Sequence, residues 1–142
     1  MPSPPHETRL RVRYGETDQM GVVHHANYLA YMEEGRTQLM RALGCTYSEL
    51  ERSGWALAVR KAHLRFRASA VYDDELLVLT AVDHVGGASV TFSYRIERAS
   101  DRRLLAEGTT EMACVRSVGA ERKPSLLPEE LRGRLESALA EV

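Results

Sequence analysis

The residues of this chain that are best suited to chemistry lie close together near its N-terminus. Asp18 supplies a carboxylate and His25 an imidazole. Such a carboxylate can act as a nucleophile or orient an attacking water, and the sequence leaves both roles open. An imidazole can donate a hydrogen bond or transfer a proton. Gly21, between the two, lets the backbone approach a ligand closely.

A long predicted helix begins directly after these residues. Asn27 is predicted to cap this helix, which runs to Leu43 and which Gly44 ends. The first amides of a helix have no partner within it, and its N-terminus carries about half a positive charge. An acid, a titratable base and a helix end that favours developing negative charge therefore converge in one short loop.

The same residues also have interpretations without chemistry. An aspartate before a glycine most often forms a turn, His25 can be a hydrogen-bonded structural residue, and Tyr14 can be a core aromatic that ends a strand. Asp18, His24 and His25 could in principle bind a metal ion. Adjacent histidines rarely point at one ion, however, and no HExxH motif is present, so we predict no metal site.

The elements that must position these residues follow from hydrophobic periodicity. Apolar residues alternate with charged ones over residues 7–14, which predicts a strand with one solvated face. In the helix after Asn27, apolar residues recur at helical spacing. Gly35 lies in its middle at a cost of about 1 kcal/mol. This glycine indicates that something packs very close to the helix, such as a sheet wrapped around it.

The rest of the chain is predicted to form a short helix and then strands. A capping box at Thr46–Glu49 opens the short helix, and Gly54 ends it. Four strands follow in meander style, with Gly86-Gly87 as a hairpin turn. They are predicted near residues 62–68, 76–82, 90–97 and 104–115. A linker over 122–128 leads to a terminal helix over 128–140, with Leu131, Leu135 and Leu139 on one face.

An antiparallel sheet packed on one helix is an α+β architecture. We expect a single domain over residues 1–142, with a loose proline-rich N-terminus over 1–6. One helix cannot cover all the edges of such a sheet. Self-association is therefore expected, because an uncovered edge strand can pair with a second copy.

Composition excludes several classes of function. The chain has 142 residues, 44% hydrophobic and 27% charged, with a net charge of -1, so we expect no nucleic-acid partner. The longest apolar run, Leu76–Leu79, is too short to span a membrane, and the N-terminus lacks the pattern of a signal peptide. Cys45 and Cys114 form no CxxC pair, which fits a reducing compartment. We expect a cytoplasmic protein.

The N-terminal motif resembles that of a known family. Tyr14-x-x-Thr17-Asp18-x-x-Gly21-Val-Val-x-His25-x-x-Tyr28 is similar to the signature of hotdog-fold acyl-CoA thioesterases. These belong to the 4-hydroxybenzoyl-CoA thioesterase superfamily, and the nearest group is the bacterial Tol-Pal-associated subfamily. The resemblance covers nearly the whole chain, since the strand at Val59-Arg60-Lys61, the Gly-Gly hairpin and the Arg122–Pro128 tail match in place and order. It implies a five-stranded antiparallel sheet wrapped around a long central helix.

The resemblance also implies roles for particular residues. Asp18 would be the catalytic carboxylate, and Tyr14 and His25 would belong to the active site. An oxyanion would lie near Gly21 and the backbone amides that open the helix at Asn27 and Tyr28.

Coenzyme A carries phosphates, so the resemblance further requires a local basic patch. We favour Arg60 and Lys61, because they stand where the family strand borders the pantetheine channel, and Ser89 is a weaker candidate. Family members form dimers and often tetramers, with active sites at the subunit interface. A homotetramer built as a dimer of dimers is therefore expected.

The prediction is a cofactor-independent hydrolase that converts a short-chain acyl- or aroyl-CoA to the free acid and coenzyme A. Two alternatives stay open. A hotdog hydratase or dehydratase would need a paired Asp/His arrangement at other positions, which we do not find. A non-catalytic module could instead bind acyl-CoA or acyl carrier protein, although Asp18 favours chemistry over binding. An acyl carrier protein is a further partner that the sequence allows, and the acyl group is not defined.

Overall fold

The structure is a computed structural model that describes residues 3–139. Its elements follow one another in this order: β1 (His6–Arg11), the short 3-10 helix η1 (Tyr14–Glu16), α1 (Ala26–Ala42), α2 (Tyr47–Arg52), β2 (Trp55–Phe66), β3 (Glu75–Val85), β4 (Ser89–Arg98), β5 (Leu104–Val118), β6 (Glu121–Pro124) and α3 (Glu129–Ser137). None of the helices within residues 3–139 is long and apolar enough to cross a membrane.

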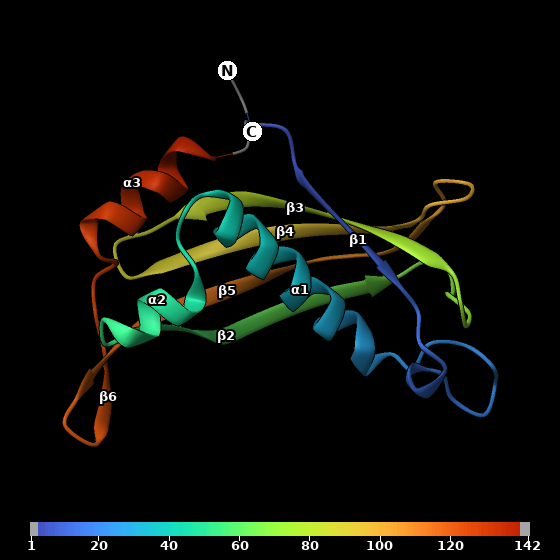
Figure 1. The fold of residues 1–142 in the computed structure, drawn as a ribbon, viewed down its shortest axis with the longest axis horizontal. Helices are drawn as coiled ribbons and strands as arrows, with labels where there is room; N and C mark the ends of the chain where they lie inside the picture. Colours follow the sequence, from blue (N-terminus) through green and yellow to red (C-terminus); the bar gives the residue numbers. More distant parts are fainter. Residues whose placement is uncertain (1–2, 140–142) are drawn as a thin grey trace.

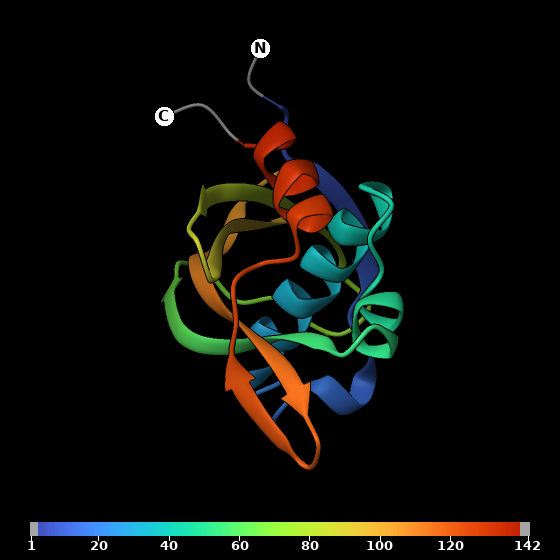
Figure 2. The ribbon, with the colours of Figure 1, turned by 90° about the vertical axis from the view of Figure 1, so that its left-hand side faces the viewer.

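One antiparallel sheet contains all six strands, in the order β1-β3-β4-β5-β2, and the short β6 pairs with the end of β5. The sheet curves around α1, which lies along its concave side (Figure 1, Figure 2). The predicted α+β hotdog architecture is confirmed. The sheet has one strand more than the five expected, because residues 121–124 fold back on β5 instead of forming a linker.

The predicted meander holds for only part of the sheet. β3, β4 and β5 are consecutive neighbours, but β2 pairs with β5 at the far side of the sheet from β3. Residues 67–74, here called the crossover segment, therefore run from the end of β2 past the ends of β5 and β4 to β3 (Figure 1). A connection of this length is not a hairpin turn, so β2 and β3 are free to lie apart.

The core lies between α1 and the concave face of the sheet. Buried apolar residues of α1 pack against buried residues of β3, β4 and β5. Gly35 makes the closest approach, since a Cβ built on it would lie 2.7 Å from Cγ1 of Val78 and closer still to Oγ1 of Thr80. This contact confirms the predicted close packing of a sheet against the middle of the helix.

The two ends of the chain differ from prediction in detail. His6, placed in the loose N-terminus, begins β1 and pairs with Thr80. α3 is shorter than the predicted helix over 128–140: Leu131 and Leu135 are buried on its inner side, whereas Leu139 lies beyond its end and bridges Val82. Residues 1–2 and 140–142 of the predicted terminal segments lie outside the described residues.

Candidate active site

An open cavity of about 230 Å³ lies where the loop before α1, the start of α1 and the crossover segment meet. Its lining residues are Asp18, Val22, Val23, His25, Tyr28, Phe66, Ala68 and Ser69. Three of the residues singled out from the sequence, Asp18, His25 and Tyr28, thus share one cavity. The structure therefore combines a carboxylate, an imidazole and apolar walls at the N-terminus of the long helix.

Asp18 opens a tight turn and keeps one carboxylate oxygen available. Its Oδ1 accepts a hydrogen bond of 2.8 Å from the backbone N–H of Met20, and its own N–H donates to the carbonyl of Val22 at 2.9 Å. Oδ2 has no hydrogen-bond partner within residues 3–139. Gly21 completes the turn at a φ of 81°, a conformation that favours glycine. Asp18 therefore forms the turn and still presents a free oxygen, so the two interpretations are compatible.

The two histidines have different contacts. Their rings lie 4.2 Å apart at 31°, and both residues are exposed. Nδ1 of His24 accepts a hydrogen bond of 3.3 Å from the N–H of Ala26, so His24 satisfies the first amide of α1. The His25 ring makes no hydrogen bond to any other described residue. No group of three or more His, Cys, Asp or Glu side chains in the described part of the chain could hold a metal ion.

The start of α1 differs from the prediction. Asn27 does not cap the helix, because the cap residue is His25 and Asn27 lies within the first turn. Its side-chain amide instead donates a 2.9 Å hydrogen bond to the carbonyl of Glu16, which the folded loop brings close. The backbone N–H groups of Asn27 and Tyr28 already donate to the carbonyls of His24 and His25. The N–H of His25 has no acceptor among the described residues, so it is free to donate to a ligand.

Glu16 holds the loop before α1 in place through several hydrogen bonds, a role that we did not predict from the sequence. Its Oε1 accepts hydrogen bonds from the N–H of Arg13 at 2.8 Å and from the hydroxyl of Tyr31 at 2.9 Å. Burial alone would raise the pKa of Glu16, but the bonds from Arg13 and Tyr31 outweigh burial and lower it. The carbonyl of Glu16 accepts from the N–H of His24. Glu16 accepts from the backbone N–H three residues before it, as the glutamate of a capping box does, but Arg13 replaces the usual Ser or Thr, so the sequence does not carry that signature.

Tyr14 does not line the cavity. Tyr14 is 75% exposed, and its ring makes an edge-to-face contact with the ring of Tyr72, at 5.6 Å between the ring centroids. The alternative interpretation as a core aromatic is wrong, because the chain leaves the sheet after Arg11 and Tyr14 begins η1. Its predicted place in the active site stays a prediction.

Tyr28 forms the inner wall of the cavity. The residue is buried, and its hydroxyl accepts a 3.1 Å hydrogen bond from the N–H of Ala70. Burial raises the pKa of Tyr28, which keeps the phenol neutral. Phe66 packs edge-to-face on its ring at 5.4 Å. Phe66 was not singled out from the sequence, because its place in the cavity depends on where β2 lies in the sheet.

The residues predicted to bind coenzyme A lie outside the cavity. Arg60 occupies a bulge in β2, and its Nε donates a 2.8 Å hydrogen bond to Glu111. Lys61 is exposed and lies opposite Glu111, while Ser89 begins β4. Phe66 lines the cavity, and Arg60 lies six residues before it on β2, about 20 Å away at roughly 3.3 Å per residue. These residues contact no atom of the Asp18 turn.

Comparisons with known proteins define the family of this chain. Residues 12–135 match the model of the Thioesterase-like superfamily, and the chain belongs to this family. Acyl-CoA thioesterase YbgC of Haemophilus influenzae is 36% identical over 124 residues, which are 87% of this chain and 88% of that relative.

Solved structures share the fold closely. Protein TT1821 of Thermus thermophilus is 36% identical, with a TM-score of 0.84 over 94% of this chain and 98% of that one. Dynemicin thioesterase is 26% identical, with a TM-score of 0.87 over 97% of this chain and 99% of that one.

Proposed function

We propose that this protein is an acyl-CoA thioesterase that uses the carboxylate of Asp18. The observation that supports this function most directly is the free Oδ2 of Asp18 in a cavity shared with His25, at the N-terminus of α1. The resemblance of the N-terminal motif supports a place near the bacterial Tol-Pal-associated subfamily. We further propose that the enzyme is cytoplasmic. We also propose that it needs no cofactor, because a carboxylate and free backbone N–H groups can together carry an acyl transfer.

In the proposed reaction, the thioester carbonyl enters beside Asp18. Oδ2 either attacks the carbonyl carbon, forming a mixed anhydride that water then hydrolyses, or accepts a proton from the water that attacks. Negative charge develops on the carbonyl oxygen, and the free N–H of His25 at the positive end of α1 stabilises it. The C–S bond breaks, the coenzyme A thiolate leaves and takes up a proton, and the acid is released.

The cavity suits a short-chain acyl or aroyl group. Its volume of about 230 Å³ exceeds the roughly 150 Å³ with which an engineered apolar cavity binds benzene. Val22, Val23 and Phe66 provide apolar walls, and the buried ring of Tyr28 closes the inner end. A long straight chain would have to pass this ring, so we expect turnover to fall as the acyl chain lengthens.

Arg60 and Lys61 are the proposed contacts of the nucleotide. Their distance from the cavity along β2 suits an extended pantetheine arm that leaves the thioester end at Phe66. Ser89 remains a weaker candidate for the same role. An acyl carrier protein, whose phosphopantetheine arm has the same chemistry near the thioester, is a second substrate carrier that this arrangement would accept.

The proposed assembly is a homo-oligomer, a dimer of dimers. β2 supports this, because it forms an edge of the sheet and presents apolar side chains at Val59, which is 49% exposed, and Phe66, which is 50% exposed. An unpaired edge of this length is a template for a second strand. Phe66 also lines the cavity, so a partner at this edge would lie beside the site.

Release of free thiol from a panel of acyl- and aroyl-CoAs tests the function. We expect hydrolysis of short-chain or aromatic members. Release from none of them, with coenzyme A still bound in calorimetry, would favour a non-catalytic binding module. Reversible hydration of an enoyl-CoA without thiol release would favour the hydratase alternative.

A further inference from the structure

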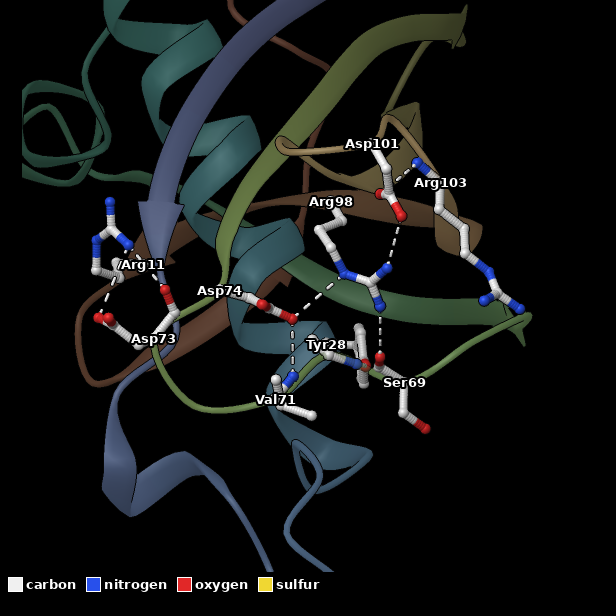
Figure 3. A network of polar contacts seen from close by, with 10 residues as sticks. Arg11, Tyr28, Ser69, Val71, Asp73, Asp74, Arg98, Asp101 and Arg103 are labelled. Atoms are coloured by element: carbon white, nitrogen blue, oxygen red, sulfur yellow. Dashed lines mark hydrogen bonds and ion pairs between the residues drawn. The ribbon is translucent and has the colours of Figure 1, made fainter.

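Arg98 joins the sheet to the segment that forms one wall of the cavity. It is the last residue of β4, and its side chain is 22% exposed. Its guanidinium contacts three residues at once: Nη2 donates to the carbonyl of Ser69 at 3.2 Å, Nε lies 3.4 Å from Oδ2 of Asp74, and Nη1 donates to Oδ2 of Asp101 at 2.9 Å (Figure 3). Two of these partners, Ser69 and Asp74, belong to the crossover segment.

The crossover segment is in turn bonded to α1 and to the loop before it, which carries Asp18. The N–H of Ala70 donates to the hydroxyl of Tyr28, and the carbonyl of Ala70 accepts from the N–H of Val23 at 2.9 Å. Val71 bridges Val22, and its N–H donates to Oδ2 of Asp74 at 3.0 Å (Figure 3). The same carboxylate oxygen therefore receives both the Val71 amide and the Arg98 guanidinium.

A continuous set of contacts thus leads from Arg98 to Asp18. Val22, which Val71 bridges, accepts the hydrogen bond from the N–H of Asp18. Arg98 itself lines no part of the cavity and touches none of the proposed reacting groups. Arg67 and Ala68 donate hydrogen bonds to the carbonyl of Leu105, and Ala70 and Val71 contact the loop that carries Asp18. Between these two sets of contacts, Arg98 attaches the carbonyl of Ser69 to the end of β4.

We propose that Arg98 is a positioning residue of the thioesterase site, which holds the crossover segment and, through Ala70 and Val71, the turn that carries Asp18. This inference rests on the proposed function. Arginine suits the task because its planar fork makes several hydrogen bonds in fixed directions, whereas a lysine has a single flexible ammonium. Displacing a catalytic group by about 1 Å can cost about 10²-fold in rate.

The test compares Arg98→Gln with two matched controls. Arg98→Gln should lower kcat by about 10²-fold, with KM changed by less than about 3-fold, because the acyl-CoA contacts themselves remain. Asp101→Asn removes the negative charge of the third partner of Arg98, which lies outside the crossover segment. Arg102→Gln breaks the 2.9 Å contact between Arg102 and Glu97 and does not alter the crossover segment. Both controls should keep kcat within about 2-fold of wild type. Arg98→Lys should recover part of the loss.

A second readout does not depend on activity. Hydrogen exchange at the amides of Ala70 and Val71 should become at least about 10-fold faster in Arg98→Gln, while amides in the centre of β4 exchange as in wild type. If Arg98→Gln does not fold, Asp74→Asn replaces it, since asparagine still accepts from Val71 but loses the ion pair.

Each outcome decides the inference. Unchanged exchange at Ala70 and Val71, or an equal loss of kcat in Arg102→Gln, would overturn the positioning role. If wild-type protein releases thiol from no acyl-CoA, the proposed function fails, whereas the exchange measurement still decides whether Arg98 holds the crossover segment.

Discussion

The hydroxyl of Tyr31 donates a 2.9 Å hydrogen bond to the carboxylate of Glu16, and this contact joins the buried side of α1 to the loop that carries Asp18. Desolvation, and then the bond to the Glu16 carboxylate, raise the pKa of Tyr31 well above its ordinary value, so the phenol remains a donor at every physiological pH. The loop is thus attached to the helix by a neutral donor and an ionised acceptor.

Tyr31→Phe should destabilise the protein by about 1.5 kcal/mol at pH 7, the low end for a hydrogen bond to a charged group. The folded-state pKa of Glu16 is lowered, so its ionised form contributes stability above its unfolded pKa, near 4.5, and that stability is lost as pH falls through the folded value. The difference in melting temperature between wild type and the variant should therefore shrink from pH 7 towards pH 3. A difference that grows on acidification would contradict this account.

Asp18→Asn should lower kcat by at least about 10²-fold, the low end for the loss of a positioned base. Asparagine keeps an oxygen that can accept from the N–H of Met20, so the turn should persist. Affinity for free coenzyme A, measured by calorimetry, should be unchanged. Asp83→Asn, at an exposed aspartate of β3 outside the cavity and outside the crossover segment, is the control. A folded Asp18 variant with near wild-type turnover would remove Asp18 from the mechanism.

Replacing both Arg60 and Lys61 with alanine should raise KM for acyl-CoA more than it lowers kcat, because nucleotide contacts bind ground and transition states alike. Both side chains meet solvent, so the wild-type KM should also rise with salt while that of the variant changes less. Arg95→Ala, at an exposed arginine of β4, serves as the control. A fall in kcat at constant KM would place the nucleotide elsewhere.

Gly35→Ala should destabilise the protein by up to about 2 kcal/mol. Overpacking against Val78 and Thr80 costs about 1–3 kcal/mol, and the better helix propensity of alanine offsets about 1 kcal/mol of this. Urea unfolding measures the change. The control is Ala30→Gly at an exposed position of α1, which should lose about 1 kcal/mol through propensity alone. A stabilised Gly35→Ala would mean that the sheet can move away from the helix.

Light scattering at micromolar concentration should report a dimer or tetramer. Val59→Lys on the exposed edge of β2 should weaken this assembly, since a charge on an edge strand opposes pairing. Val118→Lys changes an equally exposed valine on β5, 54% exposed, and should leave the mass unchanged. A monomeric wild type would remove the subunit interface from the proposed site.

Local patterns in the sequence were enough to predict most elements and part of the site. Alternating polarity indicated the strands. Gly35 indicated a long helix with a close neighbour at its middle, and Gly44 indicated where this helix ends. In the structure Gly35 lies against the sheet, and Gly44 has a φ of 84°. Asp18 and His25 could be placed in one loop because they are near each other in the chain. These features depend on residues a few positions apart, whose backbone preferences act without the rest of the fold.

Only the tertiary structure decided which distant segments meet at that loop. β2 pairs with β5 and not with β3, and this placement brings Phe66 and the crossover segment against Tyr28. The contact of Arg98 with Ser69 spans 29 residues and follows from the same crossover. No periodicity encodes such a contact, because strand order is set by how the whole sheet buries one helix, and the energies of many pairings determine it together.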